Sequence, residues 1–75
     1  MDKLDTLTLF VRIVELKSFS RAAEQLELPR GSATQIIKQL EARLGVKLLL
    51  RTTRQVRLTE LGEIYFRHCR QLLDN

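Results

Sequence analysis

The sequence of 75 residues contains one cysteine, one proline, three glycines and no tryptophan. A single cysteine excludes an internal disulfide, and no group of Cys and His residues has the spacing of a metal site. The longest uninterrupted apolar run is only a few residues long, so we expect neither a membrane span nor a signal peptide. A lone thiol without an export signal points to the cytoplasm.

The chain also lacks the residue patterns of an active site. It has no Ser/His/Asp constellation, no paired-carboxylate arrangement and no Gly-rich phosphate loop, so we expect neither an enzyme nor a cofactor in this segment. Hydrophobic residues make up 44% of the chain, which is normal for a folded domain. Seventy-five residues suffice for one small domain, and a core of that size often depends on oligomerisation.

Positive charge is concentrated between Leu28 and Leu58. This segment holds seven basic residues and one acid, Glu41, whereas the other 44 residues carry six basic and eight acidic groups. The net charge of +4 is therefore +6 in this segment and −2 elsewhere. Such a separation is typical of a surface that binds phosphates.

The spacing of apolar residues predicts a first helix that Asp2 caps and that ends near Lys17. A short second helix is expected next, with Ser20 as its N-cap and the small residues Ala22 and Ala23 facing inward. Such a small pair lets another helix approach closely, as a helix-turn-helix requires. The core stripe of the first helix is expected to consist of Leu4, Leu7, Val11 and Val14.

A third helix is expected between the turn at Pro29 and Leu44, with Gly45 as a left-handed C-cap. Its core stripe is Ala33, Ile37, Leu40 and Leu44. The opposite face is polar and begins at a helix N-terminus. Hydroxyl and amide side chains there can hydrogen-bond to base edges, while the cations suit guanine or phosphate. We assign base readout to Arg30, Ser32, Thr34 and Gln35, and backbone contact to Lys38.

Two short runs rich in β-branched and aliphatic residues, 46–50 and 55–58, are separated by Arg-Thr-Thr-Arg. This pattern predicts a β-hairpin, or wing, with cations at its tip. Cations can simply protect an exposed strand edge, but after a helix-turn-helix they favour contact with DNA phosphates or entry into a minor groove. The residues assigned to this contact are Arg51, Thr52, Thr53 and Arg54.

Thr59 is expected to cap a last helix with a wide apolar face. At about 100° per residue its apolar side chains cover an arc of roughly 200°, whereas a helix on a monomeric core needs little more than 100°. The surplus implies a second partner, which we expect to be another copy of this chain. Gly62 costs about 1 kcal/mol relative to alanine, which is explained if another helix packs tightly there. The expected dimer contacts are Leu61, Ile64, Tyr65, His68, Leu72 and Leu73.

Matching residues extend along nearly the whole chain: Phe10-Val11, Ser18-Phe19, Ala22-Ala23, Leu26, Ile37, Leu40-Glu41, residues 44–48, Arg51-Thr52, residues 56–59 and Gly62. Together they resemble the N-terminal DNA-binding region of the LysR family of bacterial transcriptional regulators. The resemblance implies a mainly α fold, a winged helix-turn-helix with a three-helix core and a hairpin wing over residues 1–58. A linker helix over residues 59–75 would pair with its dimer mate. The chain would then be a piece cut before an effector-binding domain, and any effector would bind only there.

The resemblance further implies sequence-specific binding to an inverted repeat in double-stranded DNA, with the third helix in the major groove. The departures lie where bases would be read. The family commonly has Ser-Gln-Pro/Ser and, one turn later, Ser-Arg, where this chain has residues 29–31 and then Thr34-Gln35. The mode of binding is expected to carry over and the base preferences are not, and the N-cap of this helix stays open. The alternative is a small helical adaptor that presents a basic face to an acidic protein.

Overall fold

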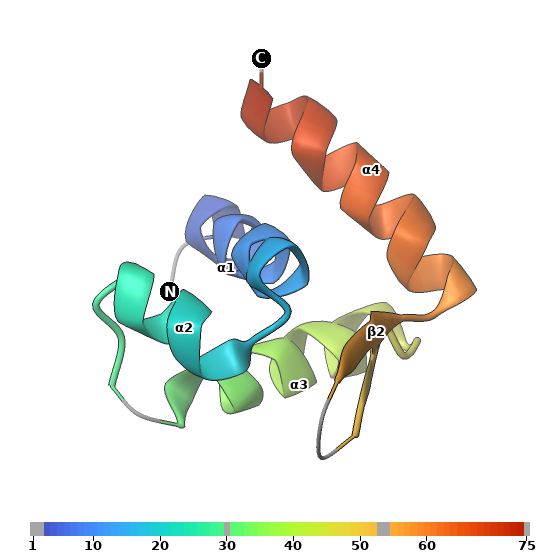
Figure 1. Ribbon diagram of the computed structural model, residues 1–75. Helices are drawn as coiled ribbons and strands as arrows, with labels where there is room; N and C mark the ends of the chain where they lie inside the picture. The colour runs from blue at the N-terminus through green and yellow to red at the C-terminus, as the bar shows by residue number, and fades with distance from the viewer. Residues whose placement is uncertain (1–2, 30, 53–54, 75) are drawn as a thin grey trace.

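The computed structural model describes residues 3–29, 31–52 and 55–74. In chain order its elements are α1 (Lys3–Leu16), α2 (Phe19–Gln25), α3 (Ser32–Leu44), β1 (Leu49–Arg51), β2 (Val56–Leu58) and α4 (Glu60–Asp74). The two strands form an antiparallel hairpin after α3 (Figure 1). The predicted winged helix-turn-helix with a C-terminal helix is confirmed. Within the described ranges, no helix is both long enough and apolar enough to cross a membrane.

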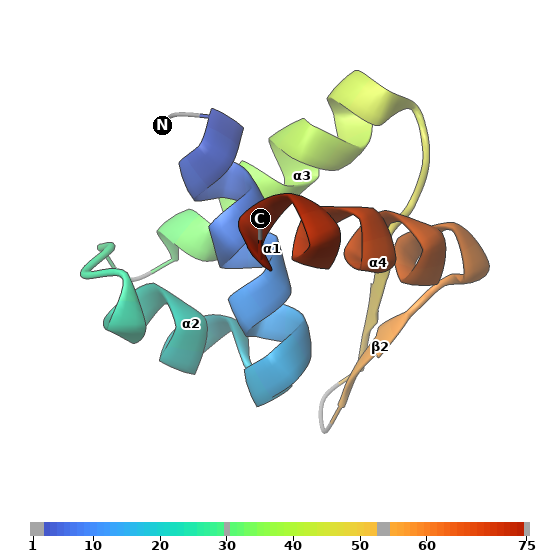
Figure 2. The same cartoon turned by 90° about the horizontal axis from the view of Figure 1, so that it is seen from above.

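Helix α1 forms the centre of the fold. Leu9, Phe10 and Ile13 are fully buried, because α2, α3 and α4 all contact this helix. Seen from above, α4 crosses over α1 (Figure 2). A helix covered on several sides buries more than one stripe, and for this reason the sequence pattern missed Leu9 and Ile13.

Two residues predicted to lie in the core are exposed. Leu4 in the first turn of α1 is 58% exposed, and Leu44 at the end of α3 is 41% exposed. Each lies in a terminal turn, where the neighbouring elements leave the side chain uncovered. The other predicted stripe positions are buried or half-buried, namely Leu7, Val11, Val14, Ala33, Ile37 and Leu40.

The second helix begins earlier than predicted. Its N-cap is Ser18, not Ser20: the Ser18 backbone is extended (φ −157°, ψ 125°), and its Oγ accepts a hydrogen bond from the amide of Arg21 at 3.1 Å. Lys17 immediately before it is left-handed (φ 54°) and ends the first helix there, leaving Ser18 free to take the extended cap geometry. The N-cap predicted for α1, Asp2, lies outside the described residues.

Both ends of α3 are glycines with left-handed backbones. Gly31 is the N-cap, with φ 86° and no side-chain bond to the helix. This identifies the N-cap that the sequence left open, at a φ that side-chain-bearing residues rarely adopt. Gly45 has φ 72°, and its amide donates to the Glu41 carbonyl at 2.8 Å, which confirms the predicted left-handed C-cap.

Thr59 caps α4, as predicted. Its Oγ1 accepts from the amide of Gly62 at 2.9 Å and donates to the carbonyl of Lys47 at 2.6 Å. Gly62 is buried, but among the described residues no helix supplies the close contact at its Cβ position. A Cβ at this position would lie 2.0 Å from the carbonyl oxygen of Leu48. The prediction of a tightly packed helix is therefore wrong, because the backbone just before β1 occupies that place.

Aromatic contacts hold α4 against α1. The ring of Phe10 meets the ring of Tyr65 edge to face, with 5.5 Å between centroids and 66° between planes. Phe66 makes a similar contact with Phe10 at 6.4 Å. Such pairs contribute about 0.5–1.5 kcal/mol beyond the apolar area that they bury. The last helix is thus part of the same core as the helix-turn-helix.

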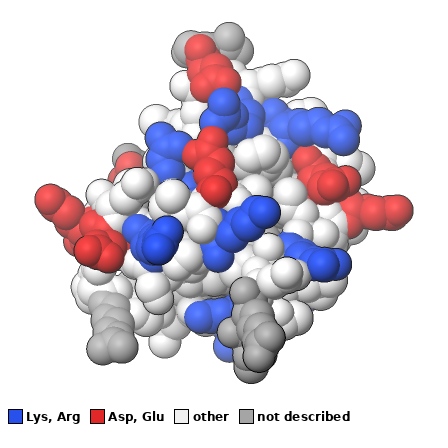
Figure 3. Space-filling model, in the orientation of Figure 1, with Lys and Arg blue, Asp and Glu red and all other residues white. Residues whose placement is uncertain are grey.

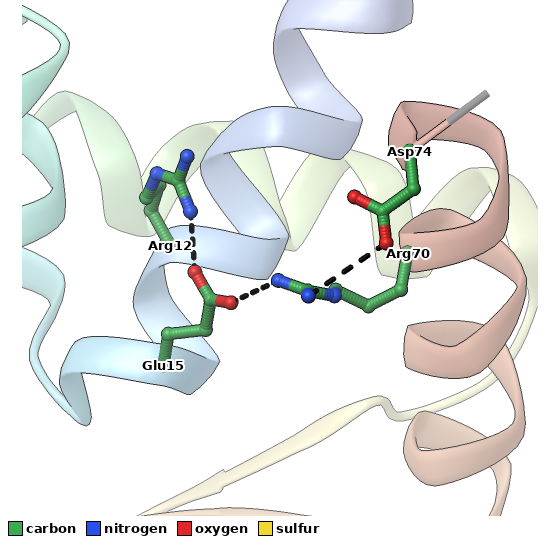
Figure 4. Close-up of polar contacts among 4 residues, drawn as sticks. All are labelled: Arg12, Glu15, Arg70 and Asp74. Carbon is green, nitrogen blue, oxygen red and sulfur yellow. Dashed lines mark hydrogen bonds and ion pairs between the residues drawn. The ribbon is translucent and has the colours of Figure 1, made fainter.

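Ion pairs join the same two helices at the surface (Figure 4). The carboxylate of Glu15 on α1 accepts hydrogen bonds from Arg12, one turn away, and from Arg70 on α4. Arg70 also lies 3.7 Å from a carboxylate oxygen of Asp74. These side chains are partly exposed, so each pair contributes at most about 1 kcal/mol. They add a polar link between α1 and α4 beside the aromatic contacts.

Candidate nucleic-acid interface

Helix α3 presents a polar face to solvent in its N-terminal half. Gln35 and Lys38 are exposed and Thr34 is half-buried, and the three lie within an arc of about 100° on the helix. Ser32 is half-buried and lines a surface depression together with Gln35. The structure therefore gathers four of the five polar residues predicted on this helix, while Arg30 lies outside the described residues. Ile36 is half-buried and packs against the core.

The hairpin has two different faces. Its register pairs Leu49 with Leu58, Leu50 with Arg57 and Arg51 with Val56. Because side chains alternate along a strand, Arg51 shares the inner face with the buried Leu49, whereas Arg57 shares the outer face with Leu50, which is 49% exposed. The basic run of the sequence is thus divided between two faces.

Arg51 connects the wing to the helix-turn-helix. Its Nη1 donates a hydrogen bond to Oγ1 of Thr34 at 2.9 Å, and its guanidinium carbon lies 4.4 Å from the centre of the Phe19 ring. The sequence showed Phe19 only as one of the residues that match the LysR family. No pattern in the sequence indicated that the ring also supports a cation.

Thr52 closes the turn at the tip of the wing. Its hydroxyl accepts from the amide of Gln55 at 2.9 Å and lies 3.2 Å from the carbonyl of Gln55, to which it donates. The side-chain oxygen of Gln55 in turn accepts from Nε of Arg57 at 2.9 Å. Thr52 therefore links the ends of the two strands, and the two remaining predicted contacts, Thr53 and Arg54, lie outside the described residues.

The one acidic residue of the basic segment, Glu41, binds backbone. Its Oε2 accepts hydrogen bonds from the amides of Leu48 at 2.8 Å and Leu49 at 3.1 Å. This contact joins the C-terminal half of α3 to the start of β1. Sequence reasoning missed this role, although a lone carboxylate among seven cations was a usable signal.

The described cations of the basic segment are all exposed: Lys38, Arg43, Lys47, Arg51 and Arg57. In the view of Figure 3 acidic and basic side chains are mixed in the upper part and acidic ones lie on both flanks, while the charged side chains across the middle and lower part are Lys and Arg. In the same orientation α3 and the wing form the lower part of the molecule (Figure 1). Among charged side chains, Lys and Arg thus predominate on the side of the fold where α3 and the wing lie.

The wide apolar arc of α4 resolves into two stripes. Cys69, Phe66 and Leu73 face the core of the domain. Leu61, Ile64 and Leu72 are 51%, 51% and 61% exposed, and with the exposed His68 they span about 80° of the helix. Two of the predicted dimer contacts, Tyr65 and Leu73, are half-buried against the protein's own core.

Residues 4–63 match the family described as bacterial regulatory helix-turn-helix protein, lysR family. The chain belongs to the LysR family. It is 47% identical over 75 residues to the uncharacterised HTH-type transcriptional regulator YhjC of Escherichia coli strain K12, covering all of this chain and 25% of that protein. It is 54% identical over 69 residues to the HTH-type transcriptional regulator CrgA of Neisseria meningitidis, covering 92% of this chain and 23% of that protein.

Solved structures give the same assignment. A complex of the BenM DNA-binding domain with catB site 1 DNA has a TM-score of 0.91 at 35% identity, covering 99% of this chain and 83% of that one. A complex of the CbnR DNA-binding domain with DNA has a TM-score of 0.89 at 30% identity, covering 97% and 84%. This LysR-family domain spans about a quarter of the length of the curated relatives that it matches. Those relatives are transcriptional regulators, which points to a protein that is not an enzyme.

Proposed function

We propose that this chain is the sequence-specific DNA-binding domain of a LysR-type transcriptional regulator and that it binds an inverted-repeat operator as a homodimer. The observation that carries the proposal is the position of the wing beside α3, joined to it by the Arg51–Thr34 hydrogen bond. One basic surface then offers a polar helix face and a hairpin side by side. The solved BenM and CbnR domains, whose fold this chain shares, are bound to DNA.

Each side of this surface has a distinct role in the proposal. The first turns of α3 enter the major groove, which is about 12 Å wide and admits a helix. Arg30, Ser32, Thr34 and Gln35 then reach base edges, and Lys38, one turn further on, holds a phosphate. Glutamine suits adenine, through its amide, and arginine suits guanine. The wing tip, with Thr53 and Arg54, follows the backbone or the minor groove.

The exposed stripe of α4 supports the homodimer. Leu61, Ile64 and Leu72 form a narrow apolar strip on a helix that runs away from α3 and the wing (Figure 1). Pairing of two such strips leaves both DNA-binding surfaces free. A two-fold axis then demands an inverted repeat, with half-sites about one helical turn apart or a multiple of it.

The relatives are about four times as long as this chain, so we place the response to an effector in a further domain. In that arrangement residues 1–58 bind DNA and residues 59–75 begin the linker that transmits the dimer geometry.

The test is selection from a random DNA library with the natural chain, Gln35→Ala and Gln71→Ala. Gln71 is exposed on α4 and serves as the matched control. The natural chain and the control should enrich the same inverted repeat. Gln35→Ala should relax one position in each half-site, at a cost of about 1–3 kcal/mol. A natural chain that enriches no sequence contradicts the proposed function, and an unchanged consensus for Gln35→Ala removes that residue from base readout.

The wing is tested by salt dependence. Arg54→Ala should weaken binding to every DNA alike and reduce the slope of log affinity against log salt by about one, because one fewer counterion is displaced. Arg67→Ala, on the exposed polar side of α4, should leave the slope as it was. An unchanged slope for Arg54→Ala would exclude a phosphate contact at the wing tip.

A further inference from the structure

Arg51 differs from the other described cations of the basic segment in what it contacts. It stands on the inner face of the wing, stacked 4.4 Å from the centre of the Phe19 ring and bonded to Thr34 at 2.9 Å. Phe19 is 8% exposed, so the ring is a fixed support. The guanidinium is thus held by a ring and a hydroxyl before any ligand arrives, whereas the outer Arg57 donates to the side chain of the neighbouring Gln55.

This contact determines the hydrogen-bonding role of the Thr34 hydroxyl. A guanidinium has only donors, so Thr34 Oγ1 must be the acceptor in the bond from Arg51. A hydroxyl has one proton to donate, and within the described residues the Thr34 hydroxyl donates to no partner. That proton therefore remains available to a ligand that approaches the polar face of α3.

We infer that Arg51 is a positioning residue that orients the hydroxyl of Thr34 as a hydrogen-bond donor to a base. This rests on the proposed function and deepens it. A donor in the major groove selects the acceptors N7 and O6 of guanine, N7 of adenine and O4 of thymine, and it finds no acceptor on cytosine, whose edge offers only the N4 amine. Thr34 then excludes cytosine at the position it faces, and Arg51 supplies specificity through Thr34.

Arg51 also keeps donors for phosphate. A guanidinium has five N–H groups, and Thr34 uses one of them. The side chain borders two surface depressions, one shared with Thr34 and Gly31 and the other with Lys17 and Thr52. The specific contribution of Arg51 is therefore separable from its charge, since a lysine keeps the charge but lacks the planar fork.

The experiment measures the affinity of the 75-residue chain for its selected sequence and for an unrelated duplex at one salt concentration. The variants are Arg51→Lys, Thr34→Val, Thr34→Ser and the double variant Arg51→Lys/Thr34→Val. Arg57→Lys on the outer face of the wing is the matched control. A thermal melt of each variant confirms folding, and the two Thr34 variants carry the test if Arg51→Lys does not fold.

Arg51→Lys and Thr34→Val should each reduce specific affinity about three- to tenfold, the value of one hydrogen bond, with little change in non-specific affinity or salt slope. The double variant should bind the selected sequence no more weakly than the single variant that loses more affinity. Library selection should admit cytosine at one position per half-site for Thr34→Val, but not for Thr34→Ser. Arg57→Lys should retain the preference of the natural chain.

Three results overturn the inference. Equal losses of specific and non-specific affinity for Arg51→Lys would make it a simple phosphate contact. Additive losses in the double variant would show that Arg51 does not act through Thr34. An unchanged base preference for Thr34→Val would remove Thr34 from readout. In all three the natural chain still selects an inverted repeat, so failure of the inference is distinct from failure of the proposed function, which shows as no selected sequence at all.

Discussion

The carboxylate of Glu41 accepts a hydrogen bond from the backbone amide of Leu48 at 2.8 Å. Leu48 is 1% exposed, so water cannot easily replace this acceptor. The same oxygen also serves the amide of Leu49, the first residue of β1. The chain leaving α3 therefore enters the wing with its amides satisfied by the helix it has just left, and this sets where the wing lies relative to α3.

Replacing Glu41 by alanine should lower the free energy of unfolding by about 2–4 kcal/mol, because two poorly hydrated amides lose their acceptor. Glu41→Gln keeps one acceptor oxygen and should cost about 1 kcal/mol. Gln39→Ala, at an exposed position of the same helix, is the control for helix propensity. Urea unfolding at one protein concentration measures all three. A loss for Glu41→Ala no larger than that of the control would show that the amides find other partners.

Gly62→Ala tests the close approach of α4 to the backbone before β1. Helix propensity alone predicts that alanine stabilises α4 by about 1 kcal/mol. The structure predicts the opposite sign, because the new Cβ would lie 2.0 Å from the Leu48 carbonyl oxygen. We expect a loss of about 3 kcal/mol or more. Gly45→Ala meets no atom within 4 Å and changes only a left-handed φ, so it should lose about 1–2 kcal/mol. A Gly62→Ala variant as stable as the natural chain would contradict the packing.

Local patterns predicted most of the elements because each has its own signal. Thr59 and Gly45 stand where a cap residue type meets a change of periodicity, and both predictions are confirmed. The N-cap of α2 could not be predicted in this way, because serines lie on both sides of Phe19. Ser18 is the cap, directly after the left-handed Lys17. That backbone angle depends on how α1 ends against its neighbours.

Contacts between residues far apart in the chain could not be predicted from the sequence. The hydrogen bond from Arg51 to Thr34 spans 17 positions, and no periodicity relates a strand residue to a helix face that far away. The apolar arc of α4 was predicted correctly as a width, but its division depends on where α1 lies. Tyr65, which the arc alone had placed in the dimer contact, instead packs against Phe10 of α1.

The exposed stripe of α4, formed by Leu61, Ile64 and Leu72, should control dimerisation. The double variant Ile64→Asp/Leu72→Asp introduces two charges at positions where the side chains are 51% and 61% exposed. The domain should therefore still fold, but as a monomer. Arg67→Glu, on the exposed polar side of the same helix, should remain dimeric. Sedimentation equilibrium over a concentration series gives the mass of each. A natural chain that stays monomeric at high micromolar concentration would remove the stripe from any role in self-association.

The pH dependence of stability should be set by Cys69 and Tyr65 in the core. Burial raises the pKa of the Cys69 thiol from 9.0 to about 11, partly offset by its hydrogen bond with Tyr65. Burial, with the nearby Cys69, also raises the pKa of the Tyr65 phenol above its ordinary 10.0. Both groups are neutral in the folded state at neutral pH, and both release their proton more readily once the chain unfolds.

A pKa raised by folding contributes stability that is complete below the unfolded value and is lost as pH rises through the folded value. For Cys69 the loss should run from about pH 9 to about pH 11, with Tyr65 adding to its upper part. Urea unfolding between pH 7 and 11 should therefore show a constant free energy of unfolding up to about pH 8.5 and a decline above it.

Cys69→Ala should be less stable at neutral pH because it leaves a small cavity, yet its decline should be shallower. Tyr65→Phe keeps the ring against Phe10 and should remove the upper part of the decline. Parallel curves for the natural chain and both variants would mean that neither group is more protonated in the folded state than in the unfolded chain.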